Sequence, residues 1–408
     1  MKTRSMYKAE RFVDRISTLP QSILDTILSL LPTEEAARTS ILSREWRYKW
    51  TTIPKLWFTL HKRTSELTSD IASTMKDMDM HDVYQVLLLR QGPIHEFALV
   101  MDDYWQHYHY FEFDVIILHL SRNHPVKKLR LDGLDGSEDI WSELPKCVFT
   151  LHHLTVSLDE FDGSENIWYK LPKSVFALHH LTDLYLCKFH IEHPLIFNGF
   201  GCLGSLCLIY VKISTQTLLH LLSNCPSLKT LNLNIDESGD KCTINELLLC
   251  LPVIKHLTLS GDVSQWLVLD SVAQELPTSL IHLKSLCLNQ SCLSWGNGSA
   301  LLLALIKCSP NLEDLHLEIE CDLDFSAIKD KYSDVWLEHL DVLGLCFGSN
   351  NLETEFVKFI LARSPKLKTV TILTAVDRKT ESKMFKMLLR APRASPKVII
   401  TPFNFLKK

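Results

Sequence analysis

The leucine spacing of residues 223–234, SNCPSLKTLNLN, constrains the fold of this chain more than any other feature. Leu228, Leu231 and Leu233 follow the spacing L-x-x-L-x-L. Leu231 and Leu233 lie two residues apart, which is the period of a strand and directs both side chains to one face. A short apolar helix is predicted before Pro226, which would end it. Such a unit cannot bury its apolar face alone and needs a copy of itself on each side.

Copies of this unit recur along the chain with a mean step of about 27 residues, inside the 20–29-residue period of leucine-rich repeats. The segment from Ile94 to Leu99 has the same spacing and is predicted to be the first repeat, and a degenerate copy lies near Leu154. The middle leucine of the motif falls at Leu129, Leu184, Leu206, Leu231, Leu257, Leu286, Leu315, Leu343 and Val370. The pattern predicts an α/β leucine-rich-repeat solenoid over residues 94–375, with a curved parallel sheet inside and helices outside.

Two neighbouring segments have almost the same sequence, DGSEDIWSELPKCVFTLHHLT at residues 135–155 and DGSENIWYKLPKSVFALHHLT at residues 162–182. They lie one repeat length apart, so an internal duplication explains them. The first copy continues as LTVSL and the second as LTDLYL, which makes the strand of the first copy the less certain of the two.

The composition limits the partners that the chain can have. It has 43 basic and 48 acidic residues and a net charge of −5, so no strong basic field is present for nucleic acid. The 12 cysteines form no C-x-x-C motif, and Cys225, Cys250 and Cys308 occupy equivalent repeat positions. We interpret them as packing residues rather than as disulfides or zinc ligands, and we predict no metal and no cofactor.

The sequence also bears on the compartment. The segment MKTRSMYKAER is basic and lacks the apolar core of a secretory signal, and no apolar run reaches the ~18 residues of a membrane helix. Cysteines that serve packing fit a reducing compartment. We therefore expect a cytoplasmic or nuclear protein that makes no use of a membrane.

Residues 12–60 have a different rhythm from the repeats. Pro20 is expected to open a helix that Pro32 ends, Thr33 could cap a second helix, and Ser43 could cap a third. Three short helices rarely supply a sufficient core, yet this segment carries more apolar surface than it can bury by itself. The surplus predicts docking either against the solenoid or against another protein, and the physical argument leaves both open.

The order of motifs in this segment resembles a plant-type F-box. The chain has D-R-I-S at residues 14–17, L-P at 19–20, I-L-S at 27–29, L-P-T at 31–33, E-A-A-R-T-S at 35–40 and W-R at 46–47. The resemblance implies binding to the Skp-type adaptor of a cullin–RING ubiquitin ligase. By position, the implied contacts are Leu19, Pro20, Ile27, Leu28, Leu31, Pro32, Ala37, Ser43, Trp46 and Trp50. The chain departs from the pattern at Gln21, Leu30 and Glu45, where Glu45 could weaken the docking.

The end of the chain also resembles a known family. Residues 61–93 are predicted to be a linker, and residues 376–408 contain the run L-L-R-A-P-R-A-S-P-K-V. This run is similar to the ending of the FBD tail that accompanies plant F-box and leucine-rich-repeat proteins. Such a tail would close the last repeat and protect the edge of its sheet.

Residues beside the inward leucines are expected to line the concave face of the sheet. Their mixture is polar without blocks of charge, which suits a protein partner better than a polyphosphate. We predict that a target protein contacts Arg130, Tyr185, Asn232, Asn234, His256, Thr258, Asn289, His316 and Glu318. Asp314, His316 and Glu318 are the nearest approach to a catalytic cluster, but they lack a nucleophile and read as surface residues.

Taken together, the resemblance implies the substrate-recognition subunit of an SCF (Skp–cullin–F-box) ubiquitin ligase, which positions a target and is not itself an enzyme. The first alternative is a non-catalytic solenoid scaffold, or an F-box protein that acts outside protein degradation. The second is an enzyme or nucleic-acid binder built on a solenoid.

Overall fold

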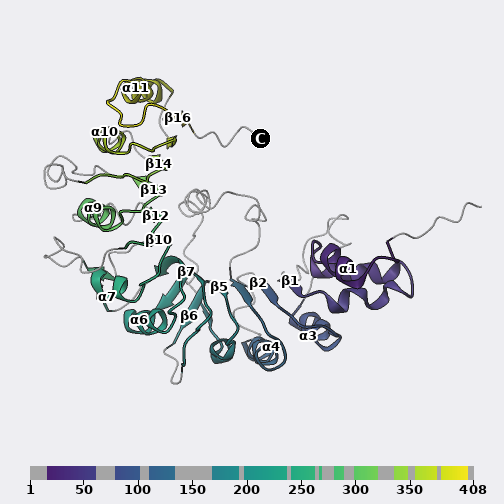
Figure 1. Ribbon diagram of the computed structural model, residues 1–408. Coiled ribbons are helices and arrows are strands. Elements are labelled where there is room, and N and C mark those ends of the chain that lie inside the picture. Colours follow the sequence, from purple (N-terminus) through teal and green to yellow (C-terminus); the bar gives the residue numbers. More distant parts are fainter. Residues whose placement is uncertain are drawn as a thin grey trace, which may run out of the picture.

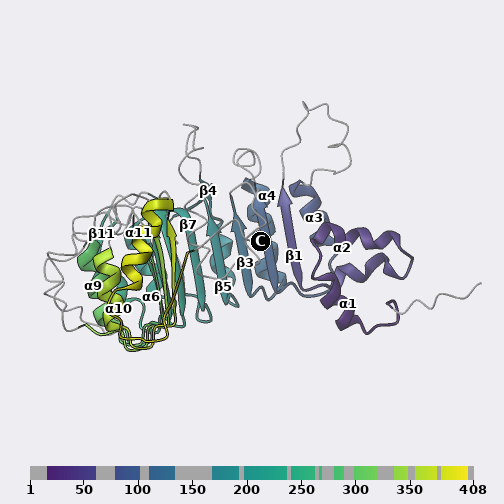
Figure 2. The same ribbon diagram turned by 90° about the horizontal axis from the view of Figure 1, so that it is seen from above.

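The computed structural model describes residues 16–60, 79–101, 110–133, 168–192, 197–236, 240–261, 266–268, 280–288, 298–319, 335–347, 354–374 and 378–402. Within these ranges the chain forms an arc in which strands line the inner side and helices the outer side (Figure 1). Seen from above, the strands stand side by side along the arc, and a helical module continues from its first strand (Figure 2). The predicted solenoid and its N-terminal module are confirmed.

The main sheet contains 14 strands among the described residues, and all of its pairings are parallel. Its continuous path consists of β1 (Lys55–Leu60), β2 (Glu96–Met101), β3 (Lys128–Asp132), β5 (Asp183–Cys187), β7 (Ser205–Ile213), β8 (Thr230–Asp236), β10 (His256–Ser260), β12 (Ser285–Leu288), β13 (Asp314–Ile319), β14 (Val342–Phe347), β15 (Thr369–Thr374) and β16 (Ile399–Pro402). The short strands β4 (Tyr169–Lys170) and β6 (Phe189–Ile191) pair beside this path, and β9 (Cys242–Thr243) pairs with β11 (Leu267–Val268).

The predicted register is confirmed strand by strand. The marker leucines pair with one another in one unbroken row, which extends from Leu56 on β1 through Phe97 on β2 to Ile400 on β16. The row is buried from Leu56 to Val370, and Ile400 is partly buried, because its side chains point away from the concave face into the layer between strands and helices. Stacking of this row buries one continuous core along the arc.

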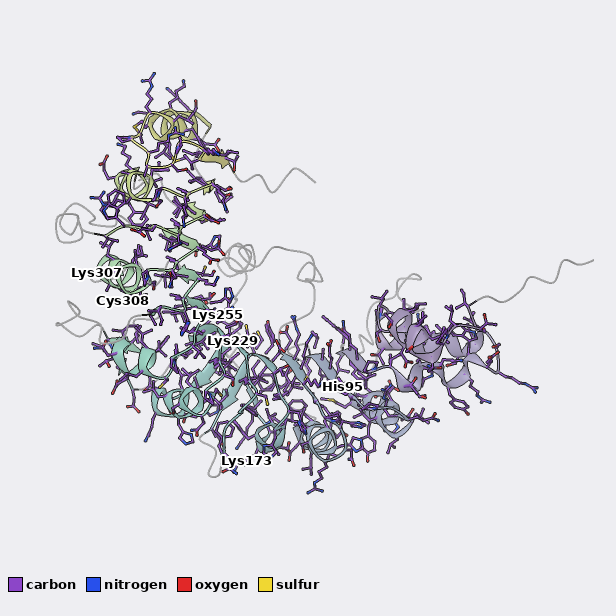
Figure 3. The ribbon with its side chains drawn as sticks, in the orientation of Figure 1. His95, Lys173, Lys229, Lys255, Lys307 and Cys308 are labelled. Atoms are coloured by element: carbon purple, nitrogen blue, oxygen red, sulfur yellow. The ribbon has the colours of Figure 1, made fainter. Side chains whose placement is uncertain are left out.

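The outer layer contains α3 (Met80–Leu88), α4 (Tyr110–Asn123), the 3-10 helix η6 (Lys173–Ala177), α6 (Thr215–Ser223), α7 (Ile244–Leu249), α9 (Gly298–Cys308), α10 (Thr354–Arg363) and α11 (Arg378–Leu389). Turns join these helices to the strands. Along the main path from β2 to β15, the carbonyl just before one strand accepts two backbone bonds from the start of the next, as Lys229 O does from Lys255 N at 2.7 Å and His256 N at 2.9 Å. Lys229 and Lys255 lie by the strands, whereas Lys307 and Cys308 lie on the outer side with α9 (Figure 3).

The sheet begins earlier than the boundary placed at residue 94. Strand β1 lies within residues 12–60 and pairs with β2 along its whole length, so the solenoid and the N-terminal module share this segment. The apolar alternation of Leu56, Phe58 and Leu60 carries the strand period, but the expected end of the three-helix module obscured it. Residues 79–88, placed in a linker, include the helix α3.

The sheet also passes directly from β3 to β5, which pair in register from Lys128↔Asp183 to Asp132↔Cys187. No strand of the sheet therefore lies between these two. The degenerate repeat near Leu154 and the first duplicated segment fall in residues 134–167, outside the described residues. The second duplicated segment ends at Thr182, directly before β5, which carries the leucine spacing that follows it.

The N-terminal module contains α1 (Gln21–Leu28), α2 (Thr33–Arg38), η1 (Thr39–Ile41) and η2 (Trp46–Thr52). Helix α1 ends at Leu28, before Pro32, and the capping predicted for Thr33 is wrong. The hydroxyl of Thr33 instead accepts a hydrogen bond at 2.7 Å from the backbone N–H of Trp57 on β1. This bond covers part of the free edge of the first strand.

The C-terminal strand β16 pairs in parallel with β15 and so extends the sheet by one strand. The Ser395 hydroxyl donates to Leu367 O at 2.7 Å, and Ala394 N donates to Leu361 O at 2.9 Å, which ties the last turn to the preceding repeat. The segment therefore covers the edge of β15, and β16 itself becomes the last strand of the sheet.

The nine cysteines within the described ranges are free thiols. Burial raises the pKa of Cys207 to about 12 and the pKa of Cys225 to about 11, so both stay protonated at neutral pH. These thiols fill repeat positions, as the sequence predicted. Across the described residues, no helix combines the length and the apolar character that crossing a membrane requires.

Candidate protein-interaction surfaces

The N-terminal module has a buried core that continues through β1 into the core of the solenoid. Leu24, Leu28, Ala36, Trp46, Trp50 and Ile53 are buried. The indole N–H of Trp46 donates to Ser17 Oγ at 2.6 Å, so this buried ring has a polar partner. A short helix contributes to stability mainly through such packing, because its own propensity is small.

This core changes the role of three predicted adaptor contacts. Leu28, Trp46 and Trp50 lie inside the module and cannot meet a partner with their side chains. The other predicted contacts remain at the surface, with Leu19 and Ala37 half-buried and Pro20, Ile27, Leu31, Pro32 and Ser43 exposed. Ser43 Oγ accepts a hydrogen bond from Trp46 N at 3.3 Å, but the N-cap of η2 is Glu45, so Ser43 contacts the start of this helix without being its N-cap.

The most exposed apolar residues of the module are not among the adaptor contacts predicted from the sequence. Ile41 is 87% exposed, Leu30 82% and Leu42 66%. Ile16, Ile23 and Tyr48 are also exposed. The signal was present in the apolar set of α1 and the turn after it, which is wider than one buried stripe. Large apolar side chains gathered on one small module indicate an interaction surface.

The module is fixed to the solenoid by an arginine from the outer layer. Arg90 follows α3, and its Nη1 donates to Trp50 O at 3.1 Å while its Nη2 donates to Ile53 O. Desolvation by burial lowers the pKa of Arg90 to about 10, opposed by the charge of Asp25, so the guanidinium stays charged at neutral pH. Gln91 N also donates to Thr51 O at 3.1 Å. These hydrogen bonds therefore fix the orientation of the module relative to the solenoid.

The concave face presents its side chains in rows that follow the strand register. The central row consists of Trp57, Ala98, Arg130, Tyr185, Cys207, Asn232, Thr258, Cys287, His316, Gly344, Thr371 and Thr401. Five predicted target contacts belong to this row and are half-buried: Arg130, Tyr185, Asn232, Thr258 and His316. His256 is half-buried in the adjacent row.

The remaining predicted target contacts differ in position. Asn234 is 7% exposed and Glu318 is 6% exposed, so neither is available as a surface contact. The turn after β10 covers Asn234, because Gly261, at φ +74°, lies so close that a Cβ there would collide with Asn234 Oδ1. Asn289 lies outside the described residues.

The acidic and histidine residues of β13 have no catalytic geometry. Desolvation lowers the pKa of His316 to about 4, and burial together with Glu313 raises the pKa of Asp314. His316 is therefore neutral at physiological pH, and Glu318 is buried. In the part of the chain that the structure describes, no group of three or more His, Cys, Asp or Glu side chains could hold a metal ion.

The structure therefore joins a compact helical module to a leucine-rich parallel solenoid, and both parts are similar to known families. The F-box domain family matches residues 16–58, and the family described as "FBD-associated F-box protein At5g56370, LRR repeats" matches residues 151–272. The resemblance drawn from the sequence is confirmed, and the chain is a relative of the plant F-box/FBD/leucine-rich-repeat proteins.

Among the similar curated proteins is the F-box/FBD/LRR-repeat protein At1g13570 of Arabidopsis thaliana, which is 27% identical over 94% of this chain and 97% of its own length. The FBD-associated F-box protein At5g56370 of the same plant is 25% identical over 88% of this chain and 75% of its own length. A yeast crystal structure of Rad7 and Elc1 aligns over 93% of this chain and 91% of its own chain, with a TM-score of 0.40 and 13% identity. That likeness is too low to carry an argument.

Proposed function

We propose that the chain is the substrate-recognition subunit of an SCF ubiquitin ligase. In this proposal the F-box binds a Skp-type adaptor, and the solenoid holds a target protein for ubiquitination. An F-box combined with leucine-rich repeats suggests a substrate-adaptor role in general. The family resemblance supports a Skp-type adaptor as the partner of the F-box. The surfaces of the described residues support separate sites for the adaptor and for the target.

The observation that carries the proposal is the exposed apolar surface of the F-box. Its core is filled by Leu24, Leu28 and the two tryptophans, yet Leu30, Ile41 and Leu42 remain in solvent. Exposing such side chains is unfavourable unless a partner covers them, at roughly 25 cal/mol per Å² of apolar surface. From the sequence alone, docking of this surface on the solenoid remained open. In the structure the solenoid does not cover Leu30, Ile41 or Leu42.

The junction supports a positioning role. Strand β1 belongs both to the F-box segment and to the sheet, and Arg90 bonds the F-box to the outer layer. A target on the concave face would therefore keep a fixed orientation relative to the adaptor. Such positioning raises the effective concentration of a target near the conjugating machinery, with the chemistry supplied by other subunits. The chain would act in the cytoplasm or the nucleus, where its thiols remain reduced.

Adaptor binding can be tested by replacing exposed residues only. The full chain with Leu30→Asp and Leu42→Asp is expected to lose co-purification with a Skp-type adaptor, because two charges enter an apolar contact. The control is Leu249→Asp on α7, which places the same charge at a solenoid leucine whose exposure (61%) is close to that of Leu42 (66%). Retained adaptor binding by the double variant would remove the F-box role.

The alternative is a scaffold that binds partners without promoting degradation. Such a scaffold could bind the adaptor or not, but in either case no ubiquitin would be transferred to its partners. If the chain is a ubiquitin-ligase subunit, proteins captured with the adaptor-bound complex should gain ubiquitin and accumulate when the proteasome is inhibited. Captured partners that stay unmodified under both conditions would favour the scaffold.

A further inference from the structure

Arg130 lies between two aromatic rings at the F-box end of the concave face. Its guanidinium carbon is 4.3 Å from the ring centre of Tyr185 on β5 and 5.7 Å from that of Trp57 on β1. Strand β2 lies between Trp57 and Arg130, and its residue in this row is Ala98. A small residue there lets the long arginine side chain reach across one strand towards the tryptophan.

Asp132 holds the guanidinium in this position. Arg130 Nη2 donates to Asp132 Oδ2 at 2.7 Å, and the two side chains are 29% and 9% exposed. An ion pair of this low exposure is screened less than one at an open surface. Arg130 is therefore ordered before any partner arrives, which reduces the entropy lost on binding.

The guanidinium keeps donors that no described residue uses. Of its five N–H groups, only Nη2 has a hydrogen bond within the described ranges. Nε is fully buried without a partner there, whereas Nη1 is not among the fully buried atoms. An acceptor that arrives from the concave side therefore meets Nη1 first. Carboxylates match the planar donors of arginine best.

The surrounding charges also favour an anion. Lys55 Nζ lies 5.7 Å from the ring centre of Trp57 and has no ion pair among the described residues. The nearby carboxylates already have partners, since Glu96 pairs with Lys128 at 2.9 Å and Asp132 pairs with Arg130. On β5, Asp183 adds a negative charge beside Lys128, so the positive charge that favours an anion is that of Lys55, on the Trp57 side of Arg130.

We propose that Trp57, Arg130 and Tyr185 form the anchor of the target-binding surface and receive an acidic side chain of the target, flanked by an apolar residue. Arg130 and Lys55 take the carboxylate, and the rings of Trp57 and Tyr185 take the apolar neighbour. Trp, Tyr and Arg are the residue types that carry most of the energy of protein interfaces. The inference rests on the proposed function, and it places the target at the end of the arc that adjoins the F-box.

Capped nonapeptides provide the test, with a central Glu, Gln or Lys in a background of mixed apolar residues. Their binding to the full chain, purified with a Skp-type adaptor, is measured by fluorescence anisotropy. Wild type should bind the Glu peptides at least tenfold more tightly than the Gln peptides. Arg130→Met should abolish this preference, and Arg130→Lys should keep part of it, because lysine retains the charge and loses the planar fork.

The matched control is Lys229→Met, which removes an exposed cation elsewhere on the sheet and should leave the preference unchanged. Equal binding of Glu and Gln peptides by wild type, or an equal loss in Lys229→Met, would overturn the anchor. Thermal unfolding of each variant shows whether it is folded, and Arg130→Lys serves if Arg130→Met is not. Co-purification of the adaptor is scored separately, so its loss with the Glu preference intact overturns the F-box role alone.

Discussion

The imidazole of His316 on β13 lies against the bare backbone of Gly344, its in-register neighbour on β14. A methyl group at Gly344 would lie 2.9 Å from His316 Cε1 and would collide with Nδ1. The missing side chain therefore makes the space in which the ring is buried. This burial is the cause of the lowered pKa of His316.

Gly344→Ala should force the ring of His316 towards solvent. We expect the pKa of His316 to rise from about 4 towards its ordinary value of 6.5, because desolvation is the cause of its lowering. The measurement is a histidine NMR titration, with His316→Gln to assign the signal. Gly201→Ala is the control, since a Cβ at Gly201 meets no atom within 4 Å. An unchanged pKa in Gly344→Ala would show that the ring does not depend on the glycine.

The same histidine predicts a pH dependence of stability. The folded pKa of about 4 lies below the unfolded value of 6.5, so below 6.5 the unfolded chain binds a proton that the folded chain does not. Stability contributed by this neutral histidine is thus present above the unfolded pKa and is lost as the pH falls towards the folded pKa.

His124, whose pKa burial also lowers to about 4, adds to this loss with the same sign. Both proteins should lose free energy of unfolding between about pH 7.5 and pH 5. The loss in His316→Gln should be about 1–2 kcal/mol smaller than the loss in wild type. Denaturant unfolding at the two pH values measures the difference. Parallel losses in both proteins would contradict the assignment to His316.

Leu28 and Leu30 separate the core of the F-box from its surface. Leu28 is 2% exposed, so Leu28→Ala should cost about 2–5 kcal/mol of stability through lost burial and the cavity left behind. Leu30→Ala, at a residue 82% exposed, should change stability by less than about 0.5 kcal/mol.

Adaptor affinity should respond in a different way. Leu30→Ala should weaken adaptor binding while leaving the unfolding transition where it is. Unfolding curves and adaptor pull-downs on the same preparations give both quantities. A large stability loss in Leu30→Ala would show that this side chain is part of a core.

Arg90→Met should loosen the junction between the F-box and the solenoid. The change removes the side-chain donor of Ile53 O and one of the two donors of Trp50 O, which keeps the bond from Ile53 N at 3.4 Å, at a cost of about 1–3 kcal/mol. Amide hydrogen exchange should increase in residues 46–60 and stay unchanged in the later repeats, because the repeats contact only their neighbours. Arg122→Met, on the exposed surface of α4, is the control with the same change of charge. Equal exchange in both variants would show that Arg90 does not hold the junction.

The strand register was predictable from the positions of the leucines. Leucines two residues apart are all buried in only one arrangement of neighbouring strands. Leu129, Leu231 and Val370 fall in one row as their spacing requires. The match of residues 16–58 to the F-box domain was predictable for a different reason, the order of the short motifs in this segment. The packing role of the cysteines was predictable because they occupy equivalent positions in the repeats.

The separation of core from surface was not predictable within the F-box. Leu28 and Leu30 are both apolar residues near a helix end, and only packing of α1 against η2 decides which one is buried. Asn234 and Asn232 look equivalent in the sequence, yet the turn at Gly261 covers Asn234 alone.

The sequence by itself determined the repeat, its period and the row of buried leucines, because local periodicity and stacking of like units leave no other way to bury them. Only the tertiary structure decided that β1 joins the F-box to the sheet, that β3 pairs directly with β5, and that Arg130 reaches Trp57 across Ala98. These contacts join residues far apart in the chain, so they depend on which strands become neighbours. No spacing within one repeat records that choice.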